Sequence, residues 1–268
     1  MQVAEVLADL LSEQAALDDL LMQLTEEQWG APTASPRWDV TDQVAHLTFF
    51  DQAAATAISD ETAFEVLTKE LWTNAMHGTD QLDAFTLDPL RVLDFGERVA
   101  AWRRARTALE VAASGLKDHD RVSWFGPAMG AASFLTARLM ECWAHGQDIV
   151  DAVGAQRLAT DRLRHVAQLG VMTRAWSYLN RNLAVPEVDI AVRLTSPSGE
   201  KWQWGTDDAT CSVVGSAEDY CLVVTQRRNV GDTRLLVTGD AATEWMTIAQ
   251  AFAGPPTTKP AGGNAPTS

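Results

Sequence analysis

The sequence lacks any apolar run of the roughly 18–20 residues that a membrane-spanning helix needs. It also lacks the basic segment followed by an apolar core with which a secretory signal begins. Basic residues are scarce, because 21 lysines and arginines stand against 36 aspartates and glutamates, a formal net charge of −15. Such a charge repels phosphate backbones and anionic membranes. We therefore expect a cytoplasmic protein whose partners include neither nucleic acid nor a membrane.

Cysteine is scarce as well. The three cysteines, Cys142, Cys211 and Cys221, are odd in number and widely spaced, and they form no Cys-x-x-Cys pair. This pattern favours buried thiols in a reducing compartment over a disulfide framework. The apolar fraction of 46% and the charged fraction of 21% are those of an ordinary globular protein. A chain of 268 residues is long enough for two domains with separate cores.

Hydrophobic spacing divides the chain into a helical part and a mixed part. Apolar residues recur at helical spacing before Pro186, and from Glu187 they alternate at every second residue, which is typical of strands. The final stretch is rich in Pro, Thr, Gly and Ala and cannot bury enough surface to order itself. We predict a helical bundle over residues 1–185, a small α+β domain over residues 186–254 and a disordered tail over residues 255–268.

The expected helices and strands follow from the same spacing and from their capping residues. The second helix begins with Asp39 or Thr41 as its N-cap, and Ser133 is a candidate N-cap for a later helix. A turn-rich loop is expected over residues 124–130, before that helix. The expected helices cover residues 3–24, 39–57, 64–76, 89–116, 133–153, 160–176, 216–226 and 241–252, and the expected strands lie near residues 188–194, 201–204, 211–214 and 234–238.

The predicted helix over residues 133–153 carries a polar stripe. Glu141 and His145 lie one turn apart, so both can hold one ion, and Arg138 and Asp148 extend the same stripe. Apolar residues fall mostly on the other faces, which allows the stripe to point inward. Zinc needs three or four ligands, and His46 is the best candidate for the third. A lone histidine in apolar surroundings is more often a hydrogen-bonded core residue, but the distant Glu-x-x-x-His favours the ligand interpretation.

Three arginines are candidates for contact with an anionic substrate. Arg138 is a solvated helix charge, an ion-pair partner of Glu141 or an anion-binding group in the site. Arg227 and Arg228 follow a predicted helix. Their charges either interact favourably with the negative end of the helix dipole or bind a carboxylate through paired hydrogen bonds. The apolar side chains that would contact a substrate do not identify it. They are Trp124, Phe125, Met129, Trp202 and Trp204.

Three stretches resemble the maleylpyruvate-isomerase-like group of the DinB superfamily. They are Trp38 to Leu47, Arg138 to Asp148 and Thr225 to Gly254. The resemblance implies an actinobacterial metal protein with a four-helix DinB-like bundle followed by a sterol-carrier-like α+β domain. It implies that His46, Glu141 and His145 bind a divalent metal, usually zinc, and that the low-molecular-weight thiol mycothiol is a cofactor. It also implies that an arginine of the C-terminal domain, here Arg227 or Arg228, contributes to activity.

The implied chemistry is isomerisation of a small unsaturated acid by addition and later loss of the thiol. An open zinc site lowers the pKa of a bound thiol, and Arg227, Arg228 or Arg138 would stabilise the anion that forms. The same site could instead transfer the thiol to an electrophile. Two other classes stay open: a thiol-independent metal enzyme such as a cyclase, lyase or hydrolase of a biosynthetic pathway, and a non-catalytic carrier of an apolar ligand. In the carrier, Asp148 would close a structural zinc site as fourth ligand.

Overall fold

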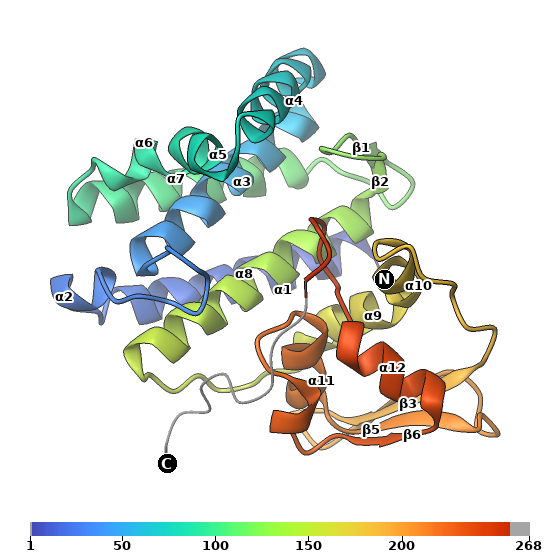
Figure 1. Cartoon of the computed structure of the whole chain (residues 1–268). Helices are drawn as coiled ribbons and strands as arrows, with labels where there is room; N and C mark the ends of the chain where they lie inside the picture. Colours follow the sequence, from blue (N-terminus) through green and yellow to red (C-terminus); the bar gives the residue numbers. More distant parts are fainter. Residues whose placement is uncertain (1, 258–268) are drawn as a thin grey trace. The chain divides into compact units, whose positions relative to one another are not determined.

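The computed structural model describes residues 2–257 of the chain (Figure 1). The chain forms two compact units, residues 1–155 and residues 156–268. No helix among the described residues combines the length and the apolar character needed to cross a membrane. All three cysteines are buried free thiols, which agrees with the expectation of no disulfide.

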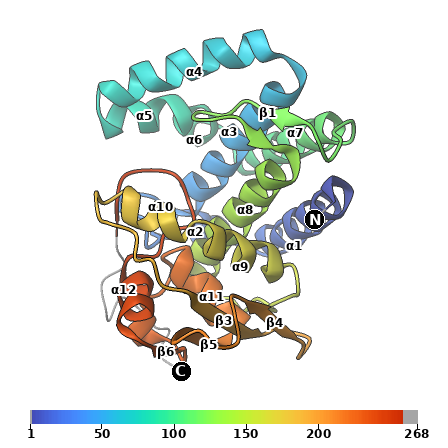
Figure 2. The same ribbon diagram turned by 90° about the vertical axis from the view of Figure 1, so that its right-hand side faces the viewer.

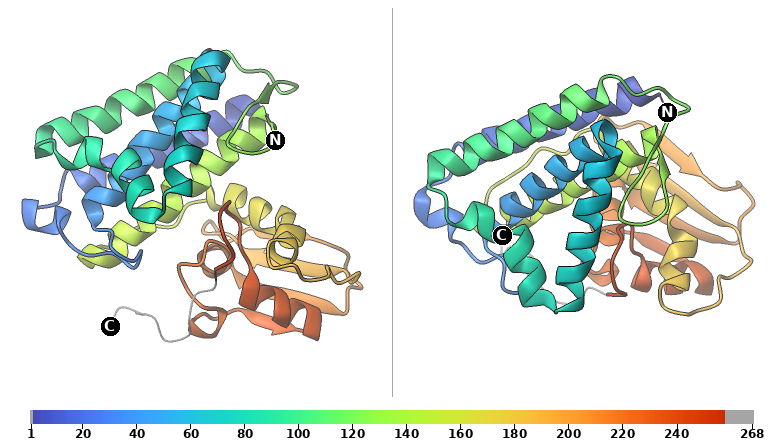
Figure 3. Two further views of the ribbon diagram at one scale, coloured as in Figure 1. Left: turned by 45° about the horizontal axis from the view of Figure 1, so that its top comes forward. Right: turned by 90° about the horizontal axis from the view of Figure 1, so that it is seen from above.

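Four long helices make up the bundle of the first unit. They are α1 (Val3–Leu21), α3 (Val40–Ser59), α7 (Phe95–Ala113) and α8 (Ala131–Val153). The helix α3 packs against α7 and α8, and α1 also packs against both of them (Figure 3). Their shared core contains Leu17, Val44, Leu47, Trp102 and Cys142, all at most 4% exposed. The predicted helical bundle is confirmed.

Shorter elements complete the first unit, and several of them differ from the prediction. They are α2 (Glu26–Trp29), α4 (Glu61–Met76), α5 (Thr79–Thr86), α6 (Asp88–Arg91), β1 (Arg121–Val122) and β2 (Met129–Gly130). The expected helix over residues 89–116 is interrupted, because Asp94 and Glu97 form a capping box that starts α7 at Phe95. The expected loop over residues 124–130 is closed by antiparallel pairing of β1 with β2, a strand pair that the sequence did not indicate.

The second unit is an α+β domain, as predicted. Its elements are α9 (Leu163–Met172), α10 (Arg174–Leu179), β3 (Ile190–Thr195), β4 (Lys201–Trp204), β5 (Cys211–Ser216), α11 (Ala217–Val224), the 3-10 helix η1 (Val230–Asp232), β6 (Leu236–Thr238) and α12 (Asp240–Ile248). The strand order is β4-β3-β5-β6, with β3 parallel to β5 and antiparallel pairs at both edges. The helices α11 and α12 pack against the sheet (Figure 2).

The boundary between the units lies earlier than predicted. We expected the helical part to extend to residue 185, but α9 and α10 pack against α11 and α12 and belong to the second unit. The contact is close, because a Cβ added at Gly170 of α9 would lie 2.8 Å from Cγ2 of Val224 in α11. Helical spacing shows which face of a helix is apolar, but it does not show which core that face joins.

The start of the expected tail is held by hydrogen bonds. Thr257 Oγ1 donates to Gln226 Oε1 over 2.7 Å, and its backbone N–H donates to Gln250 Oε1 over 3.4 Å. The expectation of disorder from residue 255 therefore does not hold for residues 255–257. The remainder of the expected tail, residues 258–268, lies outside the described residues.

Candidate metal centre

The helix α8 supplies two of the three predicted ligands from the interior of the bundle. It is buried on nearly all faces, and it ends at Gly154, whose φ of +64° is the left-handed conformation that suits glycine. Arg138, His145 and Asp148 are at most 8% exposed. The polar stripe therefore faces inward, because the rest of the bundle covers it.

The third predicted ligand comes from α3. Asp39 caps this helix, since its carboxylate accepts a hydrogen bond of 2.9 Å from the backbone N–H of Asp42. Of the two predicted N-caps, Asp39 is therefore confirmed. Arg91 pairs with the carboxylate of Asp42 over 2.7 Å and pins the first turn to α6. His46 follows in the second turn and points toward α8.

The structure brings His46, Glu141 and His145 together. Glu141 Oε2 lies 3.0 Å from His145 Nε2 and 3.5 Å from His46 Nε2, and the two imidazole centroids are 4.3 Å apart. Candidate ligand atoms of all three residues lie within 4.8 Å of one another. The side chains keep 11–23% of their surface exposed, so solvent reaches the cluster. This is the ligand set expected from the sequence, and ligation itself stays a prediction.

The charge states of the cluster suit a divalent cation. Burial, followed by repulsion from His145, lowers the pKa of His46 to about 4, so its imidazole is neutral at pH 7. Burial alone would raise the pKa of Glu141, but hydrogen bonds from the two imidazoles hold it well below its usual range. Two imidazole nitrogens and one carboxylate are typical of zinc sites that keep a position open. The residues present therefore fit the metal that the sequence implied.

Aromatic rings flank the two imidazoles. The ring of Trp38 lies 5.3 Å from that of His46 and 6.2 Å from that of His145, and it stacks on the latter with an interplanar angle of 27°. The ring of Phe50 lies 4.5 Å from His46 on another side. Phe50 also contacts Trp124 and Phe125, with centroids 6.3 and 5.8 Å away. These contacts restrict rotation of the imidazoles and give the cluster an apolar border.

Sequence reasoning missed one residue of the cluster, Gln43. Its Oε1 lies 2.5 Å from His145 Nδ1, on the side of the imidazole away from Glu141. Gln43 precedes His46 by three residues, so the two share a face of α3. That spacing could have indicated Gln43 from the sequence. It was missed because glutamine is not a typical metal ligand.

Asp148 does not join the cluster as a fourth ligand. Its Oδ2 lies 3.9 Å from His145 Nδ1, whereas Glu141 faces Nε2 of the same ring. Asp148 is thus on the opposite side of the imidazole from the clustered ligand atoms. The structural zinc site of the carrier hypothesis, which required Asp148 as a ligand, has no support in this arrangement.

Comparison with known proteins assigns the chain to a family. Residues 10–150 match the family model described as mycothiol maleylpyruvate isomerase N-terminal domain. The chain belongs to this family. An uncharacterized protein of Mycobacterium tuberculosis, found in two strains, is 43% identical over 249 residues, which is 93% of this chain and 95% of the relative.

Solved structures agree on the fold. The chain is similar to the crystal structure of a mycothiol-dependent maleylpyruvate isomerase, with a TM-score of 0.56 and 16% identity over 88% of this chain and 93% of that one. A histidine-to-alanine mutant of that isomerase gives the same TM-score and identity, over 85% and 90% of the two chains. The predicted fold and the predicted relationship to the DinB-like family are confirmed.

The structure contradicts two of the three roles predicted for Arg138. It is 3% exposed, and its Nη2 and Nε donate to Asp51 Oδ1 on α3 over 2.8 and 3.2 Å. Gln14 of α1 donates to the other oxygen, Asp51 Oδ2, over 2.9 Å. The expectation of a solvated charge is wrong, and the ion-pair partner is Asp51 rather than Glu141. A guanidinium held in this way joins α3 to α8, and a role of Arg138 in anion binding stays a prediction.

Arg227 and Arg228 lie in the second unit, directly after α11. Arg227 Nη1 donates to Thr225 O over 2.7 Å, and Arg228 Nη1 donates to Arg227 O over 2.8 Å. Arg227 thus binds the carbonyl of Thr225, the C-cap residue of α11, as the dipole interpretation expects, whereas the acceptor for Arg228 lies beyond the helix. Both side chains are half-buried rather than fully solvated. Their part in catalysis stays a prediction.

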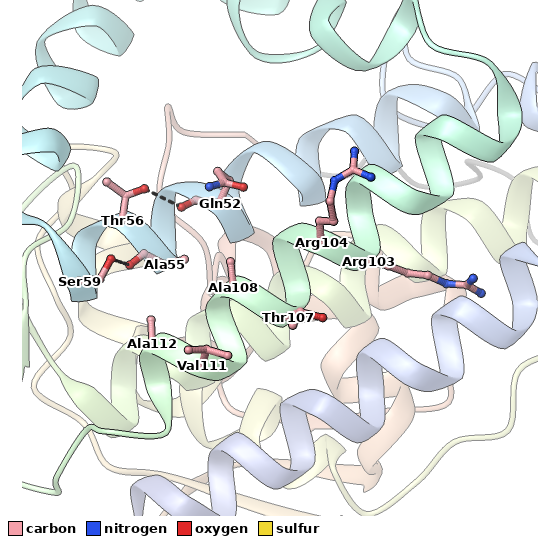
Figure 4. A pocket seen from close by; sticks show the side chains of 10 residues that line it. All are labelled: Gln52, Ala55, Thr56, Ser59, Arg103, Arg104, Thr107, Ala108, Val111 and Ala112. Carbon is pink, nitrogen blue, oxygen red and sulfur yellow. Dashed lines mark hydrogen bonds between the residues drawn. The ribbon is translucent and has the colours of Figure 1, made fainter.

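One hollow on the described residues lies away from this cluster. It is a shallow space of about 640 Å³ between α3 and α7, lined by Gln52 and Thr56 on one side and by Arg103, Arg104 and Val111 on the other (Figure 4). None of the three predicted ligands lines it. The cluster is the candidate site because of its residue types, and the hollow does not mark it.

Proposed function

We propose that this family member is a divalent-metal enzyme, with zinc as the metal, that uses mycothiol to isomerise a small unsaturated acid. The observation that carries the proposal is the convergence of His46, Glu141 and His145 inside the bundle of a chain of this family. The mycothiol dependence of its structural neighbours supports the choice of cofactor. Isomerisation leaves the composition of the acid unchanged, so the reaction needs no oxidant or reductant.

Under this proposal, the three clustered residues bind the metal and the neighbouring aromatic rings exclude water. His46 and His145 present nitrogen lone pairs, and Glu141 supplies the negative charge that holds a cation beside them. These three ligands would leave the fourth coordination position of a zinc ion open. The zinc would lower the pKa of a thiol or water bound in that position. The ring faces of Trp38 and Phe50 limit water around the imidazoles, which strengthens electrostatic interactions in the site.

A second candidate is transfer of the thiol to an electrophile, in which the thiol stays on the product. The aromatic residues near the cluster favour it. Trp38, Phe50, Trp124 and Phe125 are all half-buried, so each keeps ring surface accessible. Such a border suits an acceptor with an apolar body better than a small dianionic acid.

The deciding experiment is a metal analysis followed by an activity screen with and without mycothiol, on unsaturated acids and on apolar electrophiles. Recovery of a geometric isomer that requires both zinc and mycothiol supports the isomerase. A stable thiol adduct supports the transferase. Turnover that needs zinc but not mycothiol would replace the proposal with a thiol-independent metal enzyme, and a purified protein that binds no divalent ion would overturn it.

The arginines after α11 give a prediction for any anionic substrate found in that screen. Lysine cannot copy the two parallel hydrogen bonds that arginine makes with a carboxylate. We expect Arg227→Lys or Arg228→Lys to lower kcat/KM by on the order of ten- to a thousandfold, the scale of one lost charge-stabilising contact. Zinc content and melting temperature should match those of the native protein.

Arg234→Lys, a change at an exposed arginine of the same unit, is the matched control and should keep full activity. If Arg227→Lys and Arg228→Lys are both as active as this control, the two arginines serve only the end of α11. The anion must then be held by other groups.

A further inference from the structure

We infer that Gln43 is a positioning residue that presets His145 to bind the metal through Nε2. The inference rests on the metal-binding part of the proposed function and adds a residue that the family relationship did not supply. Gln43 is fully buried, and its amide oxygen lies 2.5 Å from His145 Nδ1. Because no solvent reaches the amide, water does not compete for this hydrogen bond.

The orientation of the Gln43 amide follows from its other partners. Its Nε2 donates to Thr33 Oγ1 over 2.8 Å and to Ser35 Oγ over 3.1 Å, which uses both of its hydrogens. Thr33 Oγ1 donates its own hydrogen to Trp38 O over 2.9 Å, so it is free to accept from Gln43. A flipped amide would turn its oxygen toward Thr33 Oγ1, whose hydrogen is already donated to Trp38 O, and that contact would be lost. The oxygen of Gln43 must therefore face His145.

The amide oxygen fixes the tautomer of His145. A carbonyl oxygen only accepts, so the imidazole must carry a hydrogen on Nδ1 in order to donate to it. In the neutral ring, Nε2 then holds a lone pair, and this atom lies 3.0 Å from the Glu141 carboxylate. The contact with Glu141 therefore needs a cation between the two atoms, which is a second hydrogen on the metal-free ring and the metal ion on the metal-bound ring. The arrangement is therefore preset for a cation in contact with both atoms.

One short loop supports this arrangement. The segment between α2 and α3 is closed by backbone hydrogen bonds from Val40 N to Ala31 O and from Thr33 N to Trp38 O, of 3.1 and 2.9 Å. It carries Thr33 and Ser35, which hold the amide of Gln43, and Trp38, which flanks both imidazoles. Partners that orient metal-binding histidines in this way typically change metal affinity by about 10- to 100-fold when they are replaced.

The test compares two variants of Gln43 by the zinc dissociation constant, measured by competition with a chromophoric chelator. Gln43→Met keeps the length of the side chain but removes the amide acceptor, and it should weaken zinc binding by about 10- to 100-fold. Gln43→Glu keeps an acceptor for Nδ1–H and should bind zinc at least as tightly as the native protein.

Gln147→Met is the matched control. Gln147 is a mostly buried glutamine of α8 whose Nε2 donates to Asp151 Oδ1 over 2.9 Å rather than to one of the three proposed ligands. It should leave zinc affinity unchanged. Equal zinc affinity in native protein and Gln43→Met would overturn the role of Gln43 alone. Absence of zinc binding in the native protein would overturn the metal site as well.

A second measurement needs no variant. Long-range ¹H–¹⁵N correlation spectra of the zinc-loaded native protein report which nitrogen of each histidine carries hydrogen. We expect His145 to show a protonated Nδ1 and a metal-bound Nε2. Coordination of His145 through Nδ1 would contradict the inference, even if Gln43→Met misfolds.

Discussion

Protein purified with His46→Ala or His145→Ala is expected to lose most of the one divalent ion that the native protein carries per chain. Each change removes a nitrogen from a cluster whose ligand atoms lie within 4.8 Å of one another. Two remaining ligands cannot hold zinc, which takes three or four. The loss of affinity should exceed the tenfold to hundredfold range that is typical of replacing a residue behind a ligand. Metal content by mass spectrometry and titration with a competing chelator measure it.

The matched control for these variants is His119→Ala. His119 belongs to the same unit, but its side chain is 86% exposed. This variant should retain the native metal content. Thermal unfolding provides a second readout, because zinc at about 100 times its dissociation constant adds about 2.7 kcal/mol to the stability of a protein that binds it only when folded. His46→Ala and His145→Ala should unfold at the same temperature with and without chelator, and full metal retention in both would refute the ligand assignment.

Asp51→Ala is expected to destabilise the first unit by about 3–5 kcal/mol, the usual cost of removing one partner of a buried ion pair. The carboxylate of Asp51 contacts Arg138 and Gln14, and both oxygens are used. Burial raises the pKa of Asp51 even though Arg138 opposes the shift, which shows how completely the pair is removed from solvent. Without Asp51, the guanidinium of Arg138 would stay buried with no counter-charge from this partner. Denaturant unfolding at pH 7 measures the effect.

Two further variants separate the buried charge from ordinary side-chain loss. Asp80→Ala removes an aspartate whose pair with Arg37 lies at the surface, and it should cost about 1 kcal/mol at most. The double change Asp51→Leu with Arg138→Met replaces the pair by apolar side chains and should recover much of the stability lost in Asp51→Ala. If Asp51→Ala is no less stable than Asp80→Ala, the pair contributes nothing that a surface pair does not.

The helices and the pairing of Glu141 with His145 could be predicted from the sequence because they depend on short-range geometry. Glu141 and His145 must share a face wherever their helix lies, since residues four apart on a helix are neighbours. His46 was the best candidate for a third ligand and the family resemblance implied the same, but no local pattern places it opposite Glu141 and His145. The structure places it there because α3 packs directly against α8.

The partners of Arg138 and His145 could not be predicted in the same way. Asp51 and Gln43 both lie on α3, at a distance of 87 and 102 residues along the chain from the groups they contact. Which residue of α3 meets which residue of α8 depends on how the two helices are shifted along each other, and no local pattern encodes that shift. The same limit explains α9 and α10, whose helical character was expected but whose neighbours were not.

The distance along the chain between α3 and α8 also bears on how the protein is made. During synthesis α3 leaves the ribosome long before α8 exists, so an early ion would find His46 alone. His46, Glu141 and His145 come together only after α8 has packed against α3, so the order of synthesis places assembly of the cluster late in folding. Under the proposed function, shortage of zinc in the cell should then leave folded protein that lacks the metal and is inactive.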